Sequence, residues 1–102
     1  MGTRVDLHYK LVDILGSSNV YFQPPASITM RYPAIVYSLD NIQARFANNM
    51  PYNQKRRYKI TYITKDPDSE LIDIFPLKLP SVDFDRVYTA DNLYHYVYTI
   101  YY

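Results

Sequence analysis

The stretch RYKITYIT, residues 57–64, carries the alternation that decides the fold. Three large apolar side chains share one face of an extended chain here: Tyr58, Ile60 and Tyr62. Polar residues occupy the alternate positions from 57 to 61. A strand with one apolar and one polar face covers a core on one side and meets water on the other. We therefore predict a strand over residues 57–64 in a mainly antiparallel or mixed sheet.

The residues before this strand begin with an amphipathic helix. Four apolar side chains recur at the spacing of one helical face: Leu7, Leu11, Ile14 and Leu15. Thr3 can cap the first turn with Asp6 three positions on, and Gly16 supplies a residue that tolerates the left-handed end of a helix. The pattern predicts a helix over residues 4–15.

Two short strands and a loop are expected between this helix and residue 57. Residues 20–22 form a brief apolar run, and residues 34–37, directly after Pro33, indicate a buried central strand. Residues 40–53 hold four asparagines and Pro51, without a regular apolar pattern. Long segments of this kind are commonly functional or disordered loops. We expect residues 41–53 to pack poorly in the isolated subunit and to become ordered on assembly.

The last third of the chain predicts a short helix and two strands. Asp66-Pro67 is typical of a helix start, and Pro76 is expected to end the helix. Residues 82–86 alternate as a strand, residues 90–92 form a turn, and residues 94–101 form the final strand. The element order predicts a single α+β domain over residues 1–102, with four to five strands and both helices on one face.

The best-patterned apolar faces identify the expected core. Its predicted members are Leu11, Ile14, Leu15, Ile35, Val36, Tyr58, Ile60 and Phe84. Truncation of one of these side chains is expected to destabilise the fold.

Composition argues against several functional classes. The chain has 102 residues, a net charge of +1, two glycines and no cysteine. A phosphate-cradling glycine loop and a thiolate metal site therefore have no residues to build them. His8 and His95 lie far apart without ligand spacing, and the pair Asp83 and Asp85 is more typical of a solvated sheet face than of an acid–base pair. We predict no enzymatic activity, no cofactor, no metal and no membrane span.

The most unusual feature is tyrosine, with 13 copies. Tyrosine suits surfaces that are wet alone and dry in a complex, but it also half-buries well on an ordinary sheet. The strand over residues 94–101 is apolar on both faces, which is typical of a central strand or of one that awaits a partner. The candidate interface residues are Tyr94, Tyr96, Tyr98 and Tyr101, the basic cluster Lys55, Arg56 and Arg57, and the loop aromatics Phe46 and Tyr52.

Four stretches resemble small virion proteins of long-tailed bacteriophages, the tail terminator (tail completion) family. They are LGSSNVYFQPP (15–25), YPAIVY (32–37), KDPDS (65–69) and YTADNL (88–93). The resemblance implies a hexameric ring at the head–tail junction that caps the tail tube and docks on the head connector. It implies production in the host bacterial cytoplasm and DNA contact only in the ring lumen. Residues 72–77 depart from the regular helix of the family.

Two other functions remain open at this point. A head-closure (neck) protein belongs to the same junction, one layer nearer the capsid. A nucleic-acid-binding module is of a different class and would use the basic residues 55–57 with stacking tyrosines. The same cluster also fits a contact between subunits or a solvated surface.

Overall fold

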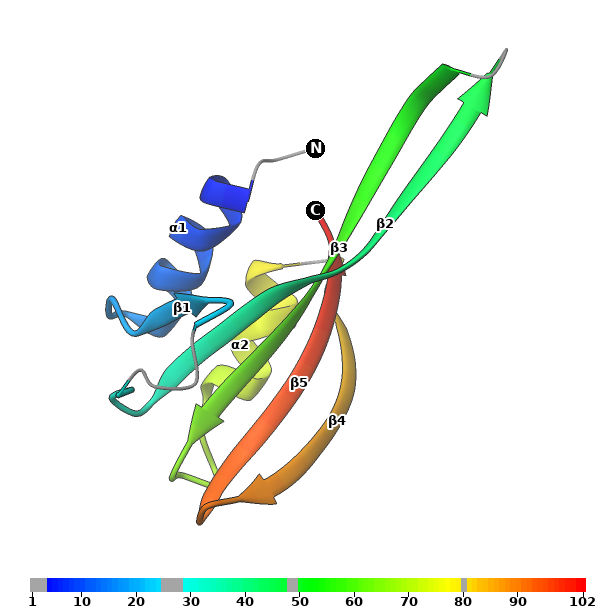
Figure 1. Ribbon diagram of the computed structural model, residues 1–102. Coiled ribbons are helices and arrows are strands. Elements are labelled where there is room, and N and C mark those ends of the chain that lie inside the picture. Colours follow the sequence, from blue (N-terminus) through cyan, green and yellow to red (C-terminus); the bar gives the residue numbers. More distant parts are fainter. Residues whose placement is uncertain (1–3, 25–28, 48–49, 80) are drawn as a thin grey trace.

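The computed structural model describes residues 4–24, 29–47, 50–79 and 81–102, with the backbone alone for 43–47 and 50–55. Over these residues the chain forms an α+β fold of two helices and a five-stranded mixed sheet (Figure 1), as predicted. The elements are α1 (Arg4–Leu15), β1 (Val20–Phe22), β2 (Ala34–Ala47), β3 (Met50–Thr64), α2 (Leu71–Lys78), β4 (Asp83–Ala90) and β5 (Leu93–Tyr101).

The strands lie in the order β1-β2-β3-β5-β4. β1 pairs with β2 in parallel, and every other neighbouring pair is antiparallel. The β4–β5 hairpin closes through Asp91 and Asn92, whose φ angles are 53° and 62°. Two successive positive φ angles are what the favoured two-residue hairpin turn requires, and Asp and Asn tolerate them. The predicted turn at residues 90–92 is therefore confirmed.

The predicted helix over residues 4–15 is confirmed at both ends as α1. Its apolar stripe places Leu7, Leu11 and Ile14 in the core. Gly16 follows with a φ of 76°, and its N–H donates to the Val12 carbonyl at 2.9 Å. A left-handed glycine therefore ends the helix, as the sequence indicated.

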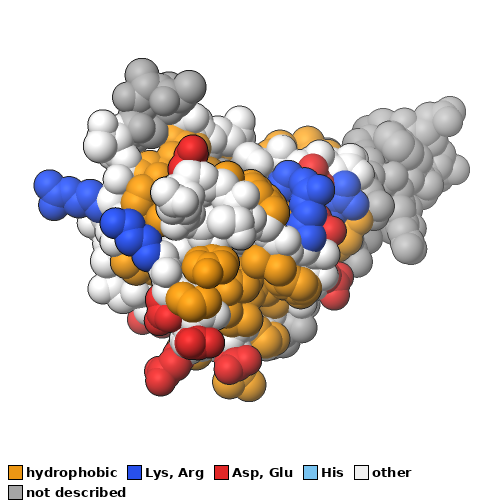
Figure 2. Space-filling view, turned by 90° about the horizontal axis from the view of Figure 1, so that it is seen from below, with side chains coloured by type: hydrophobic (Ala, Val, Ile, Leu, Met, Phe, Trp, Pro, Cys, Tyr) orange, Lys and Arg blue, Asp and Glu red, His pale blue; other side chains and the backbone are white. Residues whose placement is uncertain are grey.

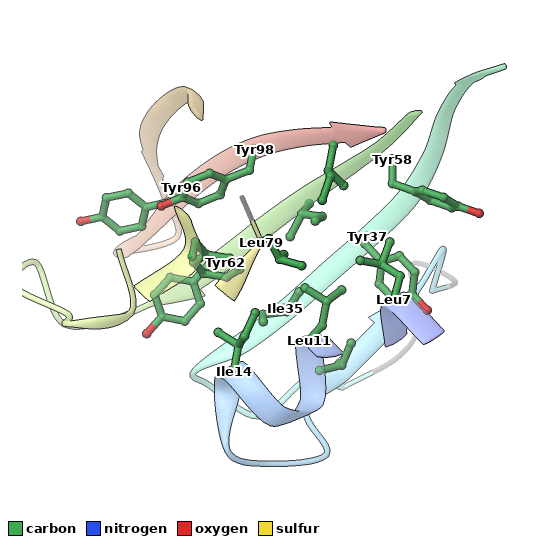
Figure 3. Packing of buried hydrophobic residues seen from close by; sticks show 14 residues of the cluster. Leu7, Leu11, Ile14, Ile35, Tyr37, Tyr58, Tyr62, Leu79, Tyr96 and Tyr98 are labelled. Atoms are coloured by element: carbon green, nitrogen blue, oxygen red, sulfur yellow. The ribbon is translucent and has the colours of Figure 1, made fainter. Parts of the chain in front are cut away.

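Both helices pack on the same face of the sheet and enclose one core (Figure 3). From the sheet the buried side chains are Val20, Ile35, Tyr37, Tyr58, Ile60, Tyr62, Tyr96, Tyr98 and Ile100. Phe75 of α2 anchors the centre, since its ring stacks on Tyr98 at 4.7 Å and meets Tyr62 at 5.8 Å. Such ring pairs add about 0.5–1.5 kcal/mol to the burial of their area.

The predicted core is partly confirmed. Its five buried members are Leu11, Ile14, Ile35, Tyr58 and Ile60. Leu15 is half-buried against the core, and Val36 is half-buried on the opposite face of the sheet. The placement of Phe84 in the core is wrong, because this side chain is 56% exposed.

The expected loop over residues 40–53 is wrong. β2 continues to Ala47 and β3 begins at Met50, and their antiparallel ladder runs from the pair Asn41–Arg57 to the pair Ala47–Met50. Backbone hydrogen bonds across a hairpin need no apolar alternation, so the sequence pattern does not reveal them. Pro51 is compatible with this position because an edge strand tolerates a residue without an N–H.

The boundaries expected for the second helix are also wrong. Asp66 makes a turn instead, in which its Oδ1 accepts from the Asp68 N–H at 2.9 Å, and α2 starts at Leu71. Pro76 lies inside the helix rather than at its end. An internal proline costs a helix roughly 3 kcal/mol. Burial of Phe75 and Leu79 on either side offsets that cost, at about 1.5–3 kcal/mol each.

Candidate assembly interface

A two-stranded hairpin projects from the sheet (Figure 1). β1 pairs with β2 only as far as Tyr37, and β5 pairs with β3 only as far as Arg57. Residues 41–47 and 50–56, here called the arm, therefore pair with each other and with no other strand among the described residues. The radius of gyration is 14.8 Å, against about 13 Å for a compact chain of this length. An isolated two-stranded hairpin is only marginally stable in water, so the arm is typical of a segment that acquires a partner.

The base of the arm is held by an ion pair at a β-bulge. The register passes from Leu39 opposite Tyr58 to Asn41 opposite Arg57, which leaves Asp40 out of the ladder. A bulge of this kind bends and twists the strand where it occurs. Arg57 Nε donates to Asp40 Oδ2 at 2.6 Å, and this bond raises the pKa of the guanidinium above its ordinary value.

The basic cluster and the tyrosine-rich strand meet at this base. Tyr101 lies opposite Arg57 in the β3–β5 ladder and is 38% exposed. The Tyr102 N–H donates to the Arg56 carbonyl at 2.9 Å, and the Arg56 side chain is exposed. The structure thus places Arg56 and Arg57 of the basic cluster beside Tyr101 of the final strand.

Three candidate residues fall outside the described side chains. Lys55, Phe46 and Tyr52 lie on the arm, where the backbone places Lys55 opposite Gln43 and Phe46 opposite Pro51. Their roles in an interface stay predictions.

The other three candidate tyrosines of β5 do not form an exposed surface, which corrects the expectation for this strand. Tyr96 and Tyr98 are 9% and 2% exposed: Phe75 of α2 stacks on Tyr98, and Tyr96 stacks on Tyr62 and donates to the Pro67 carbonyl. Tyr94 is half-buried against the same core. Side chains that fill the core of their own chain are not free to line a contact with another. Burial raises the pKa of Tyr98 to about 12, and its hydroxyl makes no hydrogen bond to any described residue.

An exposed apolar surface occurs instead around β4, which the sequence reasoning missed. β4 is the last strand of the sheet, so one of its edges is unpaired. Two exposed side chains, here called the edge patch, lie on one face of it: Phe84 (56% exposed) and Val87 (50%). Exposed apolar patches and free strand edges both mark interaction surfaces. The alternation of residues 82–86 predicts an apolar face on this strand, but it does not distinguish an exposed face from a buried one.

Charge divides between the arm and the region around β4. Residues 41–56 contain Arg45, Lys55 and Arg56 and no acidic residue. Residues 66–86 contain six acidic residues against two basic ones, a net charge of −4, and all of these side chains are exposed. Figure 2, the view from below, shows hydrophobic side chains gathered on the surface with acidic side chains along their border. The two surfaces are complementary in sign.

Comparison with known proteins adds no assignment: no family model matches the chain, and no curated protein matches its sequence. Within the described residues, no helix is long and apolar enough to cross a membrane. The same residues include no group of three or more His, Asp or Glu side chains placed to hold a metal ion.

Proposed function

We propose that this protein is a non-enzymatic structural subunit of a bacteriophage virion, a tail terminator. In this role it forms a hexameric ring that caps the tail tube and joins it to the head connector. The observation that carries the proposal is the arm. Its two outer edges pair with no other described strand, and its basic charge is opposite in sign to the charge of the β4 region. The resemblance of residues 15–25, 32–37, 65–69 and 88–93 to tail terminator proteins supports the same function.

A ring follows from contacts between different surfaces of identical subunits. When a projection of one copy binds a distinct surface of the next, the contact is heterologous, and repetition closes a ring or extends a filament. An arm and an edge patch on one chain supply two such surfaces. A subunit that stops tube growth needs a closed ring of this kind.

The histidines support a structural role. His8 Nδ1 lies 2.7 Å from the Tyr37 hydroxyl, which also accepts from Arg4 Nη1 at 3.1 Å. His95 stacks on Tyr88 with the ring centroids 4.7 Å apart. Both imidazoles therefore take part in packing contacts of the fold.

Of the two alternative functions, one would use the same interface and the other has less support. A head-closure protein of the same junction would use the arm and the edge patch in the same way. A nucleic-acid-binding module would need free cations, but the Arg57 guanidinium bonds Asp40. The exposed Arg56 side chain leaves some positive charge for DNA that passes through a ring lumen.

Localisation in the virion tests the proposal. We expect the tagged protein at the head–tail junction in electron micrographs, and overlong tails without heads when its gene is deleted. Finished tails of normal length that fail to attach would favour the head-closure alternative. Normal virions after deletion would overturn a structural role altogether.

A further inference from the structure

We propose that the arm of one copy adds as an extra strand to the free edge of β4 in a second copy of this chain. The inference rests on the proposed assembly role and names the contact between subunits. Strand addition of this kind satisfies the backbone groups of two edges at once, while the flanking side chains select the partner.

The acceptor is the outer edge of β4. The strand has eight residues and no proline, and every side chain from Asp83 to Thr89 is exposed. A register shift leaves Asp85 out of the β4–β5 ladder, so Arg86–Ala90 is the regular part of the edge. Phe84 and Val87 lie opposite Tyr98 and Tyr96, on the helix side of the sheet, yet about half of each remains exposed. An arm laid along this edge would cover them.

The donor is the outer edge of β2. β1 ends opposite Tyr37, where the Gln23 N–H donates to the Tyr37 carbonyl, and no strand in the described part of the chain lies beyond residues 38–47. This segment contains no proline. The other edge of the arm includes Pro51, which has no N–H to donate. Between its two register shifts, the β2 edge from Asn41 to Arg45 is regular, and it is therefore the better template for a ladder.

Charge favours a contact between the arm of one copy and β4 of another over a contact between two β4 edges. The arm carries three basic residues and no acidic one, whereas exposed acids lie on β4 and in the turn that follows it: Asp83, Asp85 and Asp91. Opposite charges across an interface steer encounter and fix orientation. A symmetric contact of β4 with β4 would instead bring two regions of net charge −4 together.

Cross-linking tests the contact directly, because the chain has no cysteine of its own. Two single variants, Gln43→Cys in the arm and Thr89→Cys on β4, are purified, mixed and treated with a short bismaleimide. The variant Asp13→Cys, exposed on α1, replaces each in turn as a matched control. A variant with both cysteines is treated in the same way.

We expect cross-linked dimers in the mixture of the two variants, at least tenfold above either variant alone or any mixture with the control. The double variant should give a ladder of covalent oligomers beyond the dimer. Dimers of Thr89→Cys alone would overturn the inference in favour of a β4–β4 contact, and no cross-link would overturn it outright. Failure of the proposed function shows elsewhere, as absence from the head–tail junction, and leaves a positive cross-link standing.

Discussion

Phe84 and Tyr98 lie opposite each other on β4 and β5, with their ring centroids 5.4 Å apart, yet Tyr98 is 2% exposed and Phe84 is 56% exposed. The difference arises because Phe75 of α2 stacks on Tyr98, whereas the helix does not extend over β4. The core of the domain therefore ends between two neighbouring rings. Beyond Tyr98 on this face, Phe84 and Val87 each keep about half of their surface exposed.

Substitution of the two rings should separate assembly from stability. Phe84→Ser is expected to lower the free energy of unfolding by about 1–2 kcal/mol, because the half-buried ring loses its contact with Tyr98, and to abolish oligomers. Tyr98→Ala should cost roughly 3–5 kcal/mol, since it empties a core position. Urea unfolding and light scattering after gel filtration measure the two effects. Intact oligomers of Phe84→Ser would contradict the role of the edge patch.

Truncations in the core should be costly where the helices face the sheet. Leu11→Ala and Ile60→Ala each remove a fully buried side chain, so each is expected to lower the free energy of unfolding by roughly 2–5 kcal/mol. Val5→Ala is the matched control, because Val5 lies on the same helix as Leu11 and is 47% exposed. Urea unfolding that places all three variants within about 0.5 kcal/mol of the natural chain would contradict this core.

Alkaline pH should destabilise the fold through Tyr98. An unfolded tyrosine titrates near pH 10, and burial raises the folded pKa of Tyr98 to about 12. The folded state therefore keeps this proton more tightly, and the stability present below pH 10 falls as pH rises toward 12. The loss from this group is roughly 2–3 kcal/mol. Burial also raises the pKa of Tyr37 and Tyr96, so their losses add to it.

Tyr98→Phe isolates this contribution. The hydroxyl makes no hydrogen bond to a described residue, so its removal should leave the free energy of unfolding at neutral pH unchanged or raise it. The variant should also lose less stability than the natural chain between pH 10 and 12. Urea titrations at a series of pH values measure both effects, and a strongly destabilised variant at neutral pH would contradict the assignment.

The charge of the arm should affect the rate of assembly more than its extent. Raising the salt concentration screens attraction between the arm and the β4 region, so assembly is expected to slow without being abolished. Arg56→Glu should slow it at low salt by at least tenfold, and Arg31→Glu, the same change at another exposed site, should not. Stopped-flow light scattering measures the rates. Equal rates for both variants would exclude steering by the arm.

Helix α1 could be predicted to the residue because its evidence is local. Three buried side chains at helical spacing and a glycine with positive φ define it without help from the rest of the chain. The strand at residues 57–64 was predictable for the same reason, since Tyr58, Ile60 and Tyr62 alternate within one segment.

The burial of β4 and β5 and the existence of the arm depend on tertiary contacts with other elements, which the sequence of a single segment does not reveal. Alternation placed Phe84 on the face that it occupies, but it does not reveal that α2 stops short of β4. Two rings of β5 belong to the core rather than to a free surface, because Phe75 of α2 stacks on Tyr98 and Tyr62 stacks on Tyr96. The arm was not predictable from the sequence pattern, because its ladder consists of backbone hydrogen bonds between polar segments.

β3 is one unbroken strand from Met50 to Thr64, so the same length of backbone serves the arm at one end and the core at the other. The Asp40–Arg57 ion pair lies at the point where this strand passes from the arm into the core. Displacement of the arm would therefore act on the same backbone that carries Ile60 and Tyr62 in the core, with no loop between them.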